Sequence, residues 1–161
     1  MPLTMLAAFL KTKYQHSLEE GWGALELGNL PKAEEHFQEV LSNEDDPKIT
    51  ALEVADAHNG LGALSVGHKD FFDATRWYHE GKYILDRHYG STWPKVLDWA
   101  KFDDRPAMRT LVGLGNLAYE RGDLKTAMRH YEELLASDKH DGLGIKRYLD
   151  AAKEGKKFEE A

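Results

Sequence analysis

One spacing of small and aromatic residues occurs three times along this chain. The clearest copy contains Leu114-Gly115, Gly122, Ala127 and Tyr131; the others contain Leu61-Gly62, Lys69, Ala74 and Tyr78, and Glu20-Gly21, Gly28, Ala33 and Phe37. Each copy describes two helices joined by a tight turn. Because a glycine inside a helix costs about 0.5–1 kcal/mol relative to alanine, its repetition indicates that another helix crosses there too closely for a β-carbon. The aromatic residue is expected to fill the space between one repeat and the next.

The rest of the sequence also favours helices. No segment keeps a strand-like alternation, and β-branched residues are sparse beside Ala, Leu, Glu and Lys. Pro31, Pro47, Pro94 and Pro106 each open an apolar-periodic segment, a position that tolerates proline because its missing N–H would have no helical partner there. We therefore expect an all-α protein with helices near residues 3–14, 16–27, 30–42, 47–66, 69–88, 93–101, 105–121, 123–136 and 143–155.

The repeated spacing resembles the tetratricopeptide repeat (TPR), whose units are helical hairpins of about 34 residues. The resemblance implies a right-handed superhelical solenoid of three irregular hairpins within a single domain. Its units would cover residues 14–47, 55–88 and 108–141, preceded by an N-terminal helix over 1–13, interrupted by an inserted short helix within 89–107, and closed by a capping helix over 142–156. Lys69 stands where the turn glycine of the family is usual. The charged tail after the capping helix is expected to fray.

Charge and composition argue against several classes of partner. The 161 residues carry 21 Lys and Arg against 28 Asp and Glu, a net charge of −7, which disfavours nucleic acid. The longest apolar run, Met5–Leu10, is much shorter than the about 18 residues that a membrane-spanning helix needs. The chain has no cysteine, and so neither disulfides nor thiol chemistry. These observations predict a cytoplasmic protein that binds neither nucleic acid nor a membrane.

Eight histidines make a metal site or acid–base catalysis the chemical alternatives to test against the sequence. A helical zinc site needs two histidines four residues apart, and none of the eight has that spacing. The Gly60-x-Gly62 and Gly113-x-Gly115 pairs fall inside expected helices, so they are not phosphate-binding loops. No serine lies in a recognisable nucleophile elbow. We expect no catalytic residue, metal site or cofactor, and therefore no enzyme.

The TPR resemblance implies a concave binding groove along the first helices of the units. Its expected lining is Leu18, Trp22 and Leu25 from the first unit, Asp56, Asn59, Ala63 and Val66 from the second, and Arg109, Val112, Asn116 and Tyr119 from the third. Asp56 and Arg109 occupy the same position in successive units and are expected to pair at one edge. The face is more apolar than charged, as is usual for a surface that binds a partner. In the alternative interpretation, some of these side chains belong to the core.

Four of these residues have expected roles in binding. Trp22 and Tyr119 would anchor a docked peptide or helix, and the amides of Asn59 and Asn116 would pair with its backbone. The predicted function is thus a non-catalytic protein-interaction module for a protein or peptide partner.

Two other functions stay open. One is a homo-oligomer, such as a homodimer, that associates through the N-terminal helix or through the insert bearing Trp93 and Trp99. The other is a small helical ligand carrier or enzyme. The apolar segment Leu3–Leu10 is also a candidate occupant of the groove, from the same chain or a second copy.

Overall fold

The computed structural model describes residues 11–161, and the expected all-α class is confirmed for this part of the chain. The helices are α2 (Lys13–Glu26), α3 (Leu30–Ser42), α4 (Ala51–Gly67), α5 (Phe71–Tyr89), α6 (Arg105–Glu120), α7 (Leu124–Ser137) and α8 (Lys146–Lys153), with the 3-10 helices η1 (Phe102–Asp104) and η2 (Phe158–Glu160). The expected N-terminal helix falls mostly on residues 1–10, outside the described part. None of the helices in residues 11–161 has both the length and the apolar character needed to cross a bilayer.

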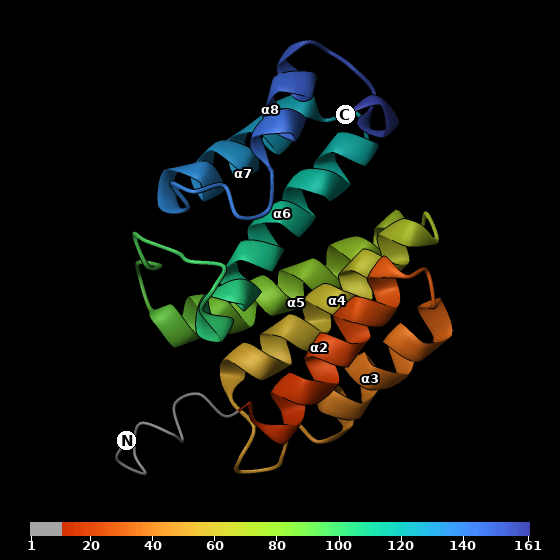
Figure 1. The fold of residues 1–161 in the computed structure, drawn as a ribbon, viewed down its shortest axis with the longest axis vertical. Helices are drawn as coiled ribbons and strands as arrows, with labels where there is room; N and C mark the ends of the chain where they lie inside the picture. The colour runs from red at the N-terminus through yellow and green to blue at the C-terminus, as the bar shows by residue number, and fades with distance from the viewer. Residues whose placement is uncertain (1–10) are drawn as a thin grey trace.

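Consecutive helices pack as three hairpins, α2–α3, α4–α5 and α6–α7. The first helix of each later hairpin also packs on the hairpin before it: α4 contacts α2 and α3, and α6 contacts α4 and α5. In Figure 1, α2 to α5 lie side by side in the lower part, and α6 continues upward from them to α7 and α8. Each of the three units expected from the sequence overlaps most of one of these hairpins, although α2, α4 and α6 begin at Lys13, Ala51 and Arg105, before the expected starts of the units.

The turns inside the three hairpins have nearly the same backbone. Asn29, Asp70 and Asp123 cap the second helices, each accepting a hydrogen bond from the N–H three residues later, with φ, ψ of −84°, 74°; −86°, 80°; and −84°, 74°. The residue before each cap has a positive φ: Gly28 (75°), Lys69 (59°) and Gly122 (80°). Lys69 therefore adopts the left-handed conformation of the glycine that it replaces, at the steric cost of a β-carbon there.

Aromatic rings on the second helices lie between glycines of the first helices. A β-carbon on Gly21 would lie 2.8 Å from the Phe37 ring, and one on Gly60, in the next hairpin, 2.4 Å from the same ring. Tyr78 is held in the same way between Gly62 (2.9 Å) and Gly113 (2.2 Å), and Tyr131 lies against Gly115 (2.5 Å). The expected close approach is confirmed, and the group that requires it is the buried aromatic ring that joins successive hairpins.

The expected short helix near 93–101 is wrong: residues 90–101 form turns, bends and irregular stretches, and only the one-turn η1 follows. The N–H of Leu97 donates to the Ser137 carbonyl of α7, at 3.1 Å. The N–H groups of Asp98 and Ala100 donate to the side chains of Asp104 and Asp98, at 2.9 Å each. A helix this short is marginal by itself, and carboxylates and a neighbouring helix end satisfy its backbone instead.

Three helix boundaries also differ from expectation. The boundary expected near residue 15 is absent, because Thr12 and Gln15 form a capping box that starts α2 at Lys13. Helix α4 begins at Ala51 rather than at Pro47, because the Thr50 side chain caps it. The capping helix α8 is shorter than expected, since the side chain of Asp141 accepts hydrogen bonds from the N–H groups that would open an earlier turn.

Candidate functional site

Burial divides the expected groove residues into two groups. Five are buried, with at most 8% of the residue's surface exposed: Leu18, Asp56, Asn59, Arg109 and Tyr119. Six are half-buried: Trp22, Leu25, Ala63, Val66, Val112 and Asn116. The expectation that the five face an open groove is wrong, because each packs against other parts of the same chain. For the six half-buried residues, contact with a partner stays a prediction.

The expected pair between Asp56 and Arg109 is confirmed as a buried ion pair. A guanidinium nitrogen of Arg109 donates to the Asp56 carboxylate at 2.6 Å, and the Trp22 indole N–H donates to the same oxygen at 3.1 Å. The other carboxylate oxygen is buried and has no hydrogen-bond partner among residues 11–161. Burial raises the pKa of Asp56, and the positive charge of Arg109 opposes that shift. The pair is therefore a buried contact between α4 and α6.

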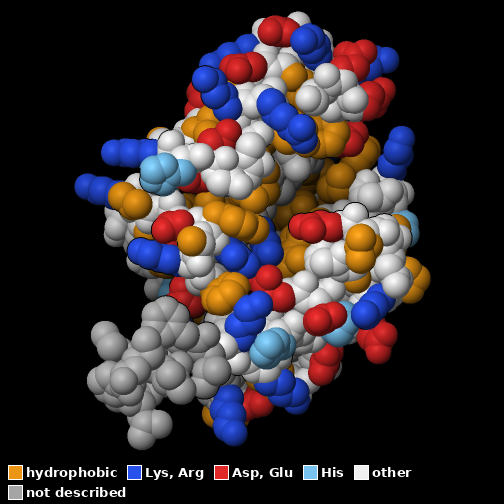
Figure 2. All heavy atoms as spheres, viewed as in Figure 1, with side chains coloured by type: hydrophobic (Ala, Val, Ile, Leu, Met, Phe, Trp, Pro, Cys, Tyr) orange, Lys and Arg blue, Asp and Glu red, His pale blue; other side chains and the backbone are white. Residues whose placement is uncertain are grey.

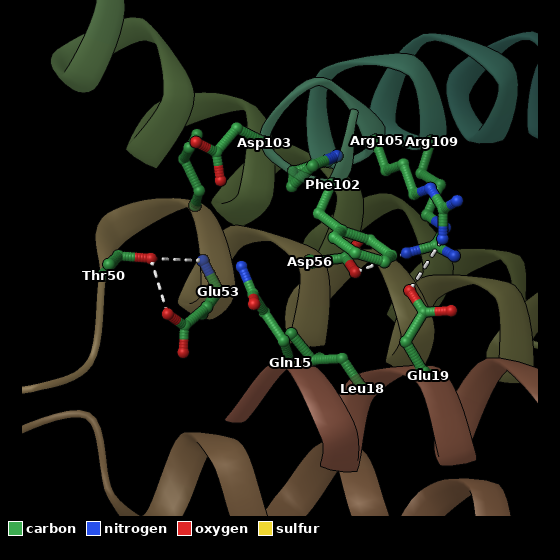
Figure 3. Close-up of a pocket in the computed structure, with 12 residues that line it drawn as sticks. Gln15, Leu18, Glu19, Thr50, Glu53, Asp56, Phe102, Asp103, Arg105 and Arg109 are labelled. Carbon is green, nitrogen blue, oxygen red and sulfur yellow. Dashed lines mark hydrogen bonds and ion pairs between the residues drawn. The ribbon is translucent and has the colours of Figure 1, made fainter. Parts of the chain in front are cut away.

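The insert covers the first part of the expected groove. Arg105 donates to the Trp99 carbonyl at 2.8 Å and to Glu19 of α2 at 3.0 Å, so α2 and the insert are tied together. Its guanidinium also lies 4.5 Å from the centre of the Phe102 ring. In Figure 3, Arg105 and Arg109 point from α6 toward Glu19 and Asp56. The space left among these side chains is about 20 Å³, room for about one water molecule.

Asn59 connects two helices and is not available to bind a peptide. Its amide nitrogen donates to the Pro106 carbonyl at 3.0 Å, and its amide oxygen accepts from the Thr110 hydroxyl at 2.9 Å. The side chain is fully buried. Asn116 is half-buried, and its amide oxygen accepts from the Tyr131 hydroxyl at 2.7 Å.

Tyr119, the second expected anchor, lies under the C-terminal tail. Its hydroxyl donates to the Lys156 carbonyl at 2.7 Å, and its ring packs edge-on against Phe158 with the centroids 5.3 Å apart. Phe158 also stacks on Tyr148 of α8. The expectation of a frayed tail is therefore wrong, and the tail closes the far end of the expected groove.

The tryptophans of the insert make contacts within the chain. The Trp93 indole N–H donates to Asp86 at 2.8 Å, and its ring lies 5.8 Å from that of Tyr89. The Trp99 ring contacts the guanidinium groups of Arg105 and Arg109. These contacts account for both rings without a second copy, so self-association through the insert stays an untested alternative. Self-association through residues 1–10 lies outside the described part.

An open groove lies elsewhere, between α5, α6 and α7, with a volume of about 460 Å³. It is lined by Thr75, His79 and Lys82 of α5, by Leu114, Leu117 and Ala118 of α6, by Arg121 and Asp123 of the following turn, and by Thr126, Arg129 and His130 of α7. We call it the α5–α7 groove. Thr75 and Arg121 also line its continuation toward Phe71 and Phe72 at the start of α5. Figure 2 shows hydrophobic side chains in a recess between the α6–α8 part and the α2–α5 part.

The α5–α7 groove has an apolar floor and a basic rim. No ion pair among residues 11–161 involves Arg121 or Arg129, whereas Lys82 pairs with Asp86 at 2.7 Å. The one acidic residue in the lining, Asp123, accepts the N–H of Thr126 as the cap of α7. Hydrogen bonding from the side chain and then from the backbone N–H of Thr126 lowers the pKa of Asp123, and the charges of Arg129 and Arg121 lower it further.

Reasoning from the sequence missed this groove, although its pattern is visible there. Thr75, His79 and Lys82 recur along one face of α5, as residues spaced by three or four do in a helix. Leu114 and Leu117 lie about half a turn around α6 from the expected groove residues. The TPR resemblance directed attention to the first helices, whereas two of the three walls are second helices.

Comparisons of this chain with protein-family models, with curated proteins and with solved structures found no match. Among residues 11–161, no group of three or more His, Asp or Glu side chains is placed to hold a metal ion.

Two half-buried histidines make the stability of the fold depend on pH. Burial lowers the pKa of His58 below the ordinary value of 6.5, with the charge of Glu80 opposing that shift and Arg76 adding to it. Burial also lowers the pKa of His130, and the nearby cations Arg129 and Lys82 lower it further. The unfolded chain therefore takes up protons more readily than the folded chain when the pH falls through 6.5. The contribution of the two uncharged histidines to the free energy of unfolding is fully present above that pH and is lost as the pH falls below it.

We expect the free energy of unfolding to fall as the pH decreases below 6.5, by at most about 1.4 kcal/mol per pH unit for each of these histidines. Denaturant titrations of the wild type and of the His58→Gln/His130→Gln variant at several pH values measure it. The variant should lose less stability on acidification, whereas the exposed pair His16→Gln/His140→Gln should behave like the wild type. Parallel pH dependences for all three proteins would contradict the assignment.

Proposed function

We propose that this chain is a non-catalytic protein-interaction module of the TPR class, a right-handed superhelical array of three hairpins that acts in the cytoplasm. Two features support the class. The three inner turns share one backbone conformation, and buried aromatic rings lie between glycines of adjoining hairpins. Such stacking is how repeat proteins bury a continuous core, and their functions are those of a binding surface.

The observation that carries the proposal is the open, apolar-floored α5–α7 groove. A volume of about 460 Å³ accepts several side chains of a docked segment. Leu114, Leu117 and Ala118 form an apolar floor of which 5–8% of each residue is exposed, and Phe71 and Phe72 add a larger apolar surface where the groove continues. A peptide or helix of a partner protein fits a groove between helices better than a flat protein surface does. The concave face is the less suitable surface, because the insert and the tail cover both of its ends.

A selection of peptides tests the proposal without knowledge of the natural partner. Random peptides displayed on phage are selected on the wild type, synthesised, and measured by fluorescence anisotropy. The Thr126→Trp variant fills the groove from α7, and Asp73→Trp places the same ring at the equivalent position of α5, outside the groove. The selected peptides should bind Thr126→Trp at least about tenfold more weakly, and Asp73→Trp as well as the wild type. Circular dichroism checks that both variants fold.

Two results would contradict the proposal. If no peptide is selected, or if the peptides bind Thr126→Trp undiminished, then the α5–α7 groove is not the binding surface. A third variant, Val112→Trp, distinguishes the remaining possibility, because Val112 belongs to the half-buried residues of the first helices. Loss of binding on Val112→Trp alone would place the partner on the concave face predicted from the sequence.

A further inference from the structure

The repeat gives the α5–α7 groove a counterpart one hairpin earlier. The counterpart lies between α3, α4 and α5 and is lined by Glu34, Gln38, Leu61, Leu64, Ser65, His68, Asp70, Asp73 and Trp77. The floor residues Leu61 and Leu64 correspond to Leu114 and Leu117 in the repeat alignment. The counterpart is smaller, about 320 Å³ against 460 Å³. Two grooves of the same design can therefore be compared position by position.

Their charges are opposite. The counterpart groove is lined by Glu34, Asp70 and Asp73 and by no lysine or arginine. The α5–α7 groove is lined by one carboxylate, which caps a helix, and by three cations, of which Arg121 and Arg129 have no ion-pair partner in residues 11–161. The chain as a whole carries a net charge of −7, so this concentration of positive charge runs against its composition.

The difference in charge between the two grooves is clearest at one pair of equivalent residues. His68 and Arg121 are the C-caps of α4 and α6, with φ, ψ of −82°, −1° and −81°, −2°. The two positions have the same backbone, and both side chains are exposed at a groove. A cation at a helix C-terminus is favourable, but that reason applies equally to both helices. The helix end therefore does not account for arginine at one groove only.

The α5–α7 groove also continues into an exposed apolar surface. Phe71 and Phe72 lie at the start of α5, and Arg121 reaches the edge of the same hollow. The Phe72 side chain is 82% exposed, the largest exposed aromatic side chain of the described residues. Aromatic rings beside free guanidinium groups suit a ligand that carries both apolar groups and carboxylates.

We propose that the α5–α7 groove binds an acidic amphipathic segment of a partner protein, with Arg121 and Arg129 receiving its carboxylates and the leucine floor and Phe72 receiving its apolar side chains. The inference rests on the proposed interaction function and adds the chemistry of the partner. Nucleic acid would also supply negative charge, but the apolar floor offers nothing to a phosphate backbone.

Three synthetic peptides test the charge preference directly. Each is a helix of about four turns with leucine along one face, and the remaining positions are glutamate in the first, glutamine in the second and lysine in the third. Fluorescence anisotropy should give a dissociation constant for the glutamate peptide at least about tenfold below that of the glutamine peptide at low salt. The ratio should shrink as salt rises from about 50 mM to about 500 mM. The lysine peptide should bind most weakly.

Matched variants locate the effect. Arg121→Glu should weaken the glutamate peptide at least about tenfold, and Arg121→Glu/Arg129→Glu should reverse the preference. His68→Glu, the same change at the equivalent helix end, should leave the affinity unchanged. Equal affinity of the glutamate and glutamine peptides, with both excluded by Thr126→Trp, would overturn the acidic preference while the interaction function stands. Failure of all three peptides to bind, equal effects of Arg121→Glu and His68→Glu, or tighter binding of a single-stranded oligonucleotide would overturn the inference.

Discussion

Arg109→Met is expected to destabilise the fold by about 3–5 kcal/mol, the loss typical when one partner of a buried ion pair is removed. Asp56 is only 3% exposed, and one of its oxygens has no hydrogen-bond partner among residues 11–161 even in the wild type. Without Arg109, its carboxylate would keep only the Trp22 indole N–H. The variant also loses the guanidinium contacts with the Trp22 and Trp99 rings. Denaturant unfolding followed by circular dichroism measures the change.

The pH dependence of this variant identifies the cause. Burial already raises the pKa of Asp56, and removal of Arg109 should raise it further. The destabilisation should therefore shrink as the pH falls and Asp56 takes up a proton. The double variant Asp56→Leu/Arg109→Met should recover at least half of the loss, since it leaves no buried charge. Arg76→Met, which breaks an exposed pair with Asp73, should cost less than about 1 kcal/mol.

Gly113→Ala is expected to destabilise the fold by about 2–3 kcal/mol, although alanine is the better helix former. The new β-carbon would lie 2.2 Å from the ring of Tyr78. That ring is fully enclosed, with Gly62 on the other side, so it cannot move away without a shift of the helices. The cost therefore measures how tightly the second and third hairpins are joined.

Gly23→Ala supplies the control, because Gly23 lies in α2, which is the first helix of its hairpin as α6 is of its own. Apart from the adjoining residues and the backbone of the same helix, no heavy atom of residues 11–161 lies within 4 Å of a β-carbon at Gly23, so the substitution should stabilise the protein by about 0.5–1 kcal/mol. A Gly113→Ala/Tyr78→Leu double variant should lose less stability than the two single changes added together, because it removes the ring edge that clashes. Equal effects of Gly113→Ala and Gly23→Ala would show that the ring does not hold the hairpins at this distance.

The hairpins and their contacts could be predicted from the sequence because the information is local. Glycine, alanine and an aromatic residue at fixed helical spacing indicate which faces approach, and Phe37, Tyr78 and Tyr131 are buried where the pattern places them. The capping residues Asn29, Asp70 and Asp123 end the inner turns by the same local rules. The Asp56–Arg109 pair could also be predicted, because the two residues occupy the same position in successive repeats.

The insert shows where local patterns stop being sufficient. Its apolar residues and Pro94 are consistent with a short helix, yet the segment consists of turns, bends and irregular stretches. Two acceptors outside residues 90–101 bind backbone N–H groups of this segment. One is the Ser137 carbonyl at the end of α7, and the other is the Asp104 carboxylate, which accepts the N–H of Asp98 instead of capping α6. A segment too short to form a stable helix by itself takes the conformation in which neighbouring groups satisfy its backbone hydrogen bonds.

The sequence by itself determined the helical class, the hairpins and the buried aromatic positions, since these depend on side-chain period and turn chemistry. Which helix face stays open was decided only by the tertiary structure. Phe158 of the tail covers Tyr119, and Trp99 of the insert covers Arg109. The tail and the insert both lie outside the repeated pattern. The period of a helix indicates an apolar face, but its exposure depends on whether a distant segment has the shape and charge to cover it. The α5–α7 groove is open because no described segment packs across it.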